Sequence, residues 1–378
     1  MFFLTPRHVK YGREFAKDAR KLLAYKRDLL SAATIADFEA GIGKLDAAVK
    51  TRESRAIEEA AAALDKQCSG FVKPQKDAGI RENCEVFLVA IVVALGVRTY
   101  FLQPFTIPTG SMFPTLNGII GTPTQEPPPN ILMRIAEFAW HGRTYVDVVA
   151  TADDVITQVR EVKSLPFMNT KFGFVSRLEI VGERSSYVVD CPKDTLGSLL
   201  RPGMAFKAGD VIARGYYDTG DHVFVDKISY HFRKPKGGEV FVFNTHKIQT
   251  NENKGKPDNW PSQFYIKRLV GTPCDTLQIK QPDLFVNGKR AEGYGFDRVM
   301  SLKDGYRGYC NGFQFPSFKY LLKPEDTFTL PEKEYFAMGD NSYHSSDSRD
   351  WGTVPQQNIM GRGVFVYWPF APHFGLIR

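Results

Sequence analysis

The chain has 378 residues and a formal net charge of +7 at pH 7, so it is long enough for two or three domains with sizeable cores. It contains no dense Arg/Lys run, zinc-ligand spacing or RNA-binding signature, so we expect no nucleic-acid partner. Its five cysteines are scattered and odd in number, which predicts no disulfide framework. Whether Cys191, Cys274 and Cys310 include a bonded pair stays open.

Residues 1–83 are expected to form a helical cytoplasmic region. Apolar residues at helical spacing predict helices at Arg7–Leu30, Thr34–Val49 and Arg52–Gln67. We interpret them as a small bundle without chemistry of its own, and a docking role for a partner stays open. Met1–Leu4 is too short for the apolar core of a cleavable signal peptide, so none is expected.

Residues 84–102 are expected to form one transmembrane helix rather than a buried core helix. The run Val86–Val97 is the most apolar in the chain. Apolar character resumes after Arg98, whose side chain can reach the lipid head groups. The basic residues that precede the span, and that predict a cytoplasmic N-terminus, are Lys73, Lys76 and Arg81. The rest of the chain is then expected on the opposite face of the membrane from this N-terminus.

The stretch Gln103–Leu116 follows this span directly and holds one serine, Ser111, between Gly110 and Met112. Three prolines restrict its backbone, and Gly110 permits a bend. The residues alone indicate a stiff ribbon that presents one hydroxyl, or equally a proline-rich connector. The stretch lies in residues 103–121, which we interpret as the first part of the core of the main domain.

Residues 122–219 are expected to form an inserted β-rich subdomain whose role stays open. It begins with a stiff linker, Thr122–Pro129. The region from Ile131 to Thr219 then reads as mostly short strands. The predicted strands are Thr144–Ala150, Val155–Val162, Phe172–Ile180, Ser186–Asp190 and Val211–Arg214.

Longer apolar strands follow in residues 220–280 and 330–378, the two remaining parts of the expected core. They are Val223–Ile228, Glu239–Phe243, Phe264–Val270, Thr276–Ile279, Tyr335–Met338 and Gly363–Trp368. Residues 281–329 are expected to form a smaller lobe. Within it, Asn287-Gly288 predicts a tight hairpin turn, and Gly293–Pro324 is expected to be irregular.

Four motifs carry a resemblance to type I signal peptidases (leader peptidases). They are PTGSMFPTL at Pro108–Leu116, GDHVFVDK at Gly220–Lys227, YIKRLVG at Tyr265–Gly271, and MGDNS at Met338–Ser342 followed by Ser345, Asp347 and Arg349. The resemblance does not cover the first eighty or so residues or the insertion, and many members of that family have two membrane spans rather than one. It implies a mainly β catalytic region and a membrane-anchored serine endopeptidase that removes signal peptides after small residues.

The resemblance also assigns the catalytic residues. It implies that Ser111 is the nucleophile and Lys267 the general base. A serine needs a base to take its proton, and a lysine serves only when neutral, a state that burial favours. Thr109 matches the position whose hydroxyl, with the Ser111 N–H, stabilises the oxyanion.

Further residues match supporting and substrate-binding positions of the family. Ser345 matches the serine that orients the lysine, although Ser342 and Ser346 stay open as alternatives. Asp347 and Arg349 match a supporting salt bridge, and Asp340 and Asn341 the start of that loop. The residues that match the substrate pocket are Phe105, Ile107, Pro108, Met112, Leu116, Tyr265 and Ile266.

No cofactor and no metal are expected, because the chain lacks HExxH or paired Cys/His spacing. The expected partners are preprotein signal peptides and membrane lipid, and an association with the secretion machinery stays open. Asp218-Thr219-Gly220 spells an aspartic-protease triplet, but no second one is present. No GxSxG motif accompanies the histidines. The alternative functions are a Ser-Lys protease with a narrow or self-cleaving substrate range, and an inactive membrane-anchored peptide-binding protein.

Overall fold

The computed structural model describes residues 6–71, 78–162, 175–192, 200–250, 254–256, 261–312 and 316–377. The chain divides into two units, Met1–Ile91 and Val92–Arg378. Lys73, Lys76 and the first residues of the strand predicted at Phe172–Ile180 lie outside the described residues.

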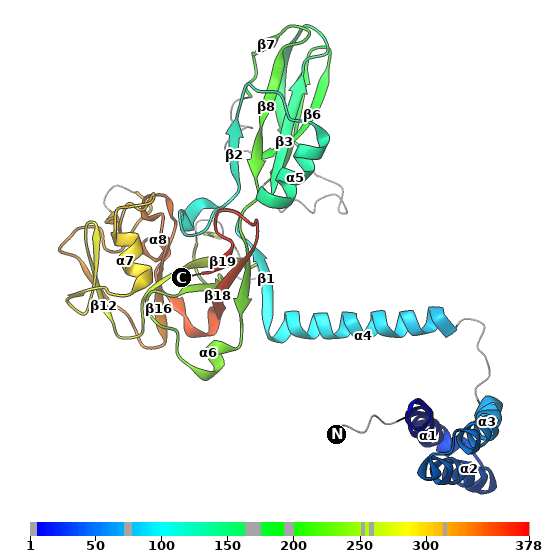
Figure 1. Ribbon diagram of the computed structural model, residues 1–378. Helices are drawn as coiled ribbons and strands as arrows, with labels where there is room; N and C mark the ends of the chain where they lie inside the picture. The colour runs from blue at the N-terminus through cyan, green and yellow to red at the C-terminus, as the bar shows by residue number, and fades with distance from the viewer. Residues whose placement is uncertain are drawn as a thin grey trace. The chain divides into compact units, whose positions relative to one another are not determined.

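Three helices of the first unit pack around a shared apolar core (blue in Figure 1). They are α1 (Arg7–Lys26), α2 (Ala32–Thr51) and α3 (Ser54–Phe71). Gly12 lies where α1 meets the other two helices, because a Cβ there would come within 2.7 Å of Val49 and 2.9 Å of Ile57. The fully buried side chains at the centre are Val9, Leu45 and Ile57. The helical periodicity of the sequence therefore corresponds to real helices with one buried face each.

A long helix, α4 (Ala78–Tyr100), runs across the boundary between the two units. Its segment Glu82–Tyr100 has a mean hydropathy of 1.6, and none of it is buried. Among the described residues it is the one helix that is long and apolar enough to cross a membrane, by length and composition.

The residues after α4 are mainly β, as predicted. In the described part of the chain, one sheet has seven strands in a single path and an eighth, β19, beside β18. The order is β1 (Leu102–Thr106), β9 (His222–Asp226), β18 (Ile359–Trp368), β10 (Val240–Asn244), β11 (Phe264–Gly271), β16 (Glu334–Met338) and β17 (Val354–Pro355), with β19 at Gly375–Leu376. All neighbours are antiparallel. Two short helices, α6 (Ser229–Phe232) and α8 (Ser348–Trp351), lie in its connections.

A second sheet has the order β14 (Lys289–Arg290), β13 (Asp283–Val286), β12 (Thr276–Lys280) and β15 (Thr327–Thr329). Strand β12 falls within residues 220–280, which are expected in the core, but this strand pairs with those of the smaller lobe. The predicted hairpin is confirmed: Val286 pairs with Lys289, and both Asn287 and Gly288 have positive φ. The expectation of an irregular Gly293–Pro324 is wrong at its start, where α7 (Tyr294–Met300) forms. Burial of Phe296, Val299 and Met300 on this short helix compensates for its length, which is marginal in isolation.

The inserted segment contains two further sheets. One has the order β2 (Ile120–Pro123), β8 (Val211–Asp218) and β3 (Arg143–Val149), and the other β6 (Ser186–Pro192), β5 (Val175–Gly182), β4 (Asp154–Glu161) and β7 (Ala205–Phe206). Two expectations need correction. The predicted linker begins inside β2, where Thr122 pairs with Tyr216. Part of the region expected to be strands forms a helix, α5 (Ile131–His141), which Asn130 caps.

The insertion leaves and rejoins the larger sheet at one narrow neck. Ile120 lies opposite Asp218 in the β2–β8 pair. Beside this pair, the Asp221 N–H donates to the Asn117 carbonyl at 2.9 Å, and the Ile107 N–H donates to the Asp221 carbonyl at 2.8 Å. Gly220 is required there, since a Cβ would lie 1.6 Å from the Ile107 oxygen. The neck thus fixes the chain just before and after the insertion.

Candidate active site

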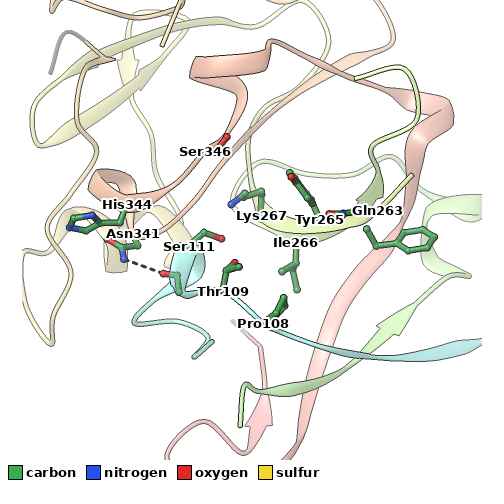
Figure 2. Close-up of a pocket in the computed structure, with 12 residues that line it drawn as sticks. Pro108, Thr109, Ser111, Gln263, Tyr265, Ile266, Lys267, Asn341, His344 and Ser346 are labelled. Carbon is green, nitrogen blue, oxygen red and sulfur yellow. Dashed lines mark hydrogen bonds between the residues drawn. The ribbon is translucent and has the colours of Figure 1, made fainter. Parts of the chain in front are cut away.

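A cavity of about 380 Å³ brings together three stretches that are far apart in the sequence (Figure 2). Ser111 comes from the turn after β1, Lys267 from β11, and Asn341 from the loop after β16. The full lining is Pro108, Thr109, Gly110, Ser111, Gln263, Phe264, Tyr265, Ile266, Lys267, Asn341, His344 and Ser346.

Ser111 lies in a single 3₁₀ turn, Gly110–Met112, that is fastened on both sides. The neighbouring Met112 side chain is fully buried and anchors the turn in the core. The Asn341 backbone N–H donates to the Ser111 carbonyl, and its side-chain amide donates to the Gly110 carbonyl, both at 3.1 Å (Figure 2). This fastening leaves the Ser111 hydroxyl to face the cavity.

Lys267 projects from the middle of the sheet and is 5% exposed. It lies opposite Phe241 of β10. Its amine donates to the Ser345 hydroxyl at 3.2 Å. In Figure 2 the Lys267 amine and the Ser111 hydroxyl are directed toward each other. The sheet therefore holds a buried amine in front of the serine that the sequence singled out.

The geometry separates the three serines that the sequence left open. Ser345 contacts the Lys267 amine. Ser346 instead donates to Asp350 at 3.1 Å, and Ser342 accepts hydrogen bonds from the Cys310 N–H and from Arg349. Of these three serines, Ser345 is thus the one that places its hydroxyl within hydrogen-bonding distance of the Lys267 amine.

Behind Ser345, Asp347 and Arg349 form a fully buried ion pair with N–O distances of 2.7–2.8 Å. Burial alone would raise the pKa of Asp347, but the charge and hydrogen bonds of Arg349 outweigh burial and hold that pKa below its usual value. The second carboxylate oxygen also accepts from the Gly339 N–H at 3.1 Å. The pair therefore ties the Ser345 loop to the end of β16.

A second buried ion pair lies on the opposite face of β11. Strand alternation directs Arg268 away from Lys267, and its guanidinium forms a two-point contact with Asp340 at 2.7 and 2.6 Å. Asp340 also accepts from Thr115, which lies 2.8 Å from the Tyr306 hydroxyl. The Arg268–Asp340 pair therefore ties β11 to the loop after β16, the same loop that the Asp347–Arg349 pair holds through Gly339.

Thr109 lines the cavity beside Ser111 (Figure 2). Its backbone is held close to Gly118, where a Cβ would lie 2.3 Å from the Thr109 carbonyl carbon. The backbone at Thr109 and Gly110, which leads into Ser111, is therefore held closely against Gly118.

The residues matched to a substrate pocket fall into two groups. Pro108, Tyr265 and Ile266 line the cavity. Ile107, Met112 and Leu116 instead lie in the buried core with Val223 and Val225. Phe105 packs edge-on against Phe264, which lines the cavity, with 5.3 Å between ring centroids.

Sequence reasoning missed Gln263, Phe264 and His344 as cavity residues. Phe264 and Gln263 precede Tyr265 on the same strand edge, so their position next to a site motif was the available signal. His344 adjoins Ser345 in the same way. Asp218 of the aspartic-protease triplet lies elsewhere, in a two-point contact with Arg143 at 2.7 and 2.9 Å.

All five cysteines are within the described residues and are free. Cys191 and Cys310 are buried, whereas Cys274 is exposed. The open question of a disulfide among these three is therefore settled against one in this structure.

Comparison with known proteins identifies the family. A family model described as "Signal peptidase, peptidase S26" matches residues 216–368. A signal peptidase I of Leptolyngbya laminosa is 32% identical over 152 residues, which cover 40% of this chain and 62% of that protein. A signal peptidase IB of Staphylococcus aureus is 30% identical over 153 residues, covering 40% of this chain and 71% of that protein. A solved signal peptidase I of Enterococcus faecalis is 25% identical, covers 34% of this chain and 97% of its own, and has a TM-score of 0.23.

The chain belongs to the signal peptidase I family. It spans about three fifths of the length of the first curated relatives it matches. The family-model match includes Lys267 and both buried ion pairs and begins after Ser111.

Proposed function

We propose that this protein is a membrane-anchored serine endopeptidase that cleaves signal peptides from exported preproteins after small residues. The observation that carries the proposal is the buried Lys267 amine, 3.2 Å from Ser345 and directed toward Ser111 across the cavity. Family membership supports the reaction class.

In the proposed reaction, the Ser111 oxygen attacks the scissile carbonyl carbon while the neutral Lys267 amine takes the hydroxyl proton. The Ser111 N–H and the Thr109 hydroxyl donate to the resulting oxyanion, and each such donor is worth about 3 kcal/mol in the transition state. Lys267 then gives its proton to the leaving amine. A water molecule, activated by the same lysine, hydrolyses the ester and regenerates Ser111.

The protonation state of Lys267 is set by opposing influences. Burial disfavours an ammonium ion, whereas a nearby carboxylate favours it. Asp347 lies close enough for its pKa to respond to Lys267, but Arg349 neutralises it with a two-point contact. We propose that this neutralisation leaves burial as the dominant influence and provides an unprotonated amine near neutral pH.

The cavity supports binding of an extended peptide beside β11. Pairing between β11 and β16 begins at Arg268, opposite Met338. The cavity borders the part of β11 before that point, from Phe264 to Lys267, together with the preceding Gln263. A peptide in the cavity would run along this strand by β-augmentation. We expect alanine-sized side chains next to Ser111, as the resemblance to type I signal peptidases implies.

We propose that α4 anchors the enzyme in a bilayer, with the cavity on the outer side of the cytoplasmic membrane. The length and hydropathy of Glu82–Tyr100 support a span. Helix α4 ends at Tyr100 and β1 begins at Leu102. The chain therefore leaves the membrane within a few residues of the end of α4, and the turn that carries Ser111 follows β1.

The test is cleavage of a model preprotein with an Ala-x-Ala site by the full chain in lipid vesicles. Ser111→Ala and Lys267→Ala are each expected to reduce the rate by more than about a thousandfold. Lys280→Ala is the matched control, because this lysine is exposed on β12, outside the cavity. Full cleavage by Lys267→Ala would refute the dyad. If the wild type binds the peptide without cleaving it, the protein is a peptide-binding protein. If the wild type cleaves only its own chain, it is a self-processing protease.

A further inference from the structure

Helix α5 of the insertion is amphipathic, but most of its bulky apolar side chains are exposed to solvent. None of its eleven residues is buried. Its exposed apolar side chains are Ile131, Leu132, Met133, Ile135, Phe138 and Trp140. Its one half-buried residue before the last turn is Glu137, whose carboxylate accepts from the Tyr145 hydroxyl of β3. Glu137 thus faces the protein and Phe138 lies edge-on against Trp368, with 5.6 Å between ring centroids, while the other bulky apolar side chains of α5 are exposed.

The helix is nonetheless held firmly in place. Asn130 caps its start, accepting from the Met133 N–H at 2.9 Å, and Gly142 ends it with φ +67°. Near its end, the Trp368 indole N–H donates to the Ala139 carbonyl at 2.9 Å, and the Phe370 N–H donates to the Trp140 carbonyl at 3.0 Å. The exposure is therefore a built feature of the fold and not a frayed end.

The chain's C-terminal segment extends this apolar surface. Phe370 packs against Trp140, with 5.6 Å between ring centroids, and Phe374 packs against Phe370 at 5.4 Å. Both phenylalanines are exposed, as is Leu376. We call the exposed apolar residues of α5 together with Phe370, Phe374 and Leu376 the apolar patch. Large contiguous exposed patches of this kind mark interaction surfaces.

We propose that the apolar patch rests in the interfacial layer of the membrane and gives the enzyme a second attachment beside α4. Bulky aliphatic side chains with Phe and Trp are the composition of interfacial helices and aromatic belts. This inference rests on the proposal that α4 spans a bilayer, and it is independent of the serine chemistry.

The sheet register places the patch near the end of that span. Trp368, which contacts α5, lies opposite His222 of β9, and His222 lies opposite Thr106 of β1. Thr106 is four residues beyond Leu102, at which β1 begins, and four strand residues cover roughly 13 Å. The surface that holds α5 is thus roughly 13 Å, measured along the strand direction, from the point at which the chain leaves α4. A lipid surface fits this location better than a distant protein partner.

The test uses tryptophan fluorescence of the full chain in phosphatidylcholine/phosphatidylglycerol vesicles, with and without dibrominated phosphatidylcholine, which quenches tryptophans in contact with acyl chains. The four tryptophans are Trp140, Trp260, Trp351 and Trp368, so α4 contributes none. Trp140→Phe is expected to remove at least half of the lipid-quenched emission. Trp351→Phe is the control, because Trp351 is 7% exposed in the core, and it should leave that component unchanged.

A second pair of variants changes the patch without touching its tryptophan. Leu132 is 76% exposed, so Leu132→Asp should leave folding intact and reduce Trp140 quenching at least twofold. Val188→Asp, at a site 57% exposed on β6, should not. Equal quenching in the wild type and Trp140→Phe would overturn the inference. Protection of Trp140 from solvent that is lost when the protein is diluted in lipid would also overturn it, because that result indicates a second copy of the chain on the apolar patch. Co-flotation of the protein with the vesicles measures attachment through α4 separately from the quenching.

Discussion

Replacing Gly339 by alanine is expected to disable the active site. A Cβ at this position would lie 2.2 Å from the Ser345 Oγ and 2.4 Å from the Ser111 carbonyl oxygen, where ordinary contacts begin at 3.4 Å. Both groups must retreat by roughly 1 Å, and a misplacement of that size costs about a hundredfold in rate. The Ser345 hydroxyl, now 3.2 Å from the Lys267 amine, would leave hydrogen-bonding range. Overpacking of this kind also costs about 1–3 kcal/mol of stability.

The assay combines the cleavage rate of an Ala-x-Ala preprotein with urea denaturation in detergent micelles. Gly237→Ala is the matched control, because its Cβ would meet only Phe296, at an ordinary 3.5 Å. We expect the control to cleave within about twofold of wild type and to lose less than about 0.5 kcal/mol. A Gly339→Ala protein with wild-type rate and stability would refute the steric reasoning, and so would an equal loss in the control.

Two further predictions concern the buried ion pairs. Asp340→Asn leaves the Arg268 guanidinium buried without its carboxylate, so the free energy of unfolding in urea should fall by about 3–5 kcal/mol; a fall below about 1 kcal/mol would contradict it. The pKa of Asp347 is below its usual value because Arg349 outweighs burial. The contribution of this carboxylate to the free energy of unfolding is therefore complete above the unfolded pKa of about 3.9, and it is lost as pH falls through the lower folded pKa. Unfolding free energies measured between pH 7 and pH 2.5 should therefore decline below about pH 4, and less steeply in Asp347→Asn; parallel curves would exclude this carboxylate as the cause.

The strands and the hairpin turn could be predicted because their signals are local. Alternation, β-branched residues and Asn287-Gly288 each act over a few neighbours, and the structure has strands and a turn at those places. The helix α5 was missed because the apolar run at its start has no clear period, and most of its bulky apolar side chains do not pack on the protein. A pattern method assumes that apolar residues face the core, and here Glu137 does so instead.

At the site, motif wording predicted which residues meet but not how each is used. Ser345 could be told apart from Ser342 and Ser346 only by three-dimensional position, since all three lie in one short loop. Ile107, Met112 and Leu116 show the same limit, because the sequence pattern around Ser111 is the same whether a neighbouring apolar residue lines a pocket or fills the core. Strand alternation predicts one further feature of the site, because Arg268 must face away from Lys267 and therefore needs its own counter-ion.

The neck between Ile120 and Asp218 has a consequence for how this protein can change over evolutionary time. Because β2 and β8 pair at the point of departure, residues 121–217 impose no spacing on Ser111 or Lys267. The entropy of closing a loop grows only slowly with its length. Mutation can therefore change the length of the connections within this segment with little effect on the geometry around Ser111 and Lys267, provided that α5 keeps its contacts with Trp368 and Phe370.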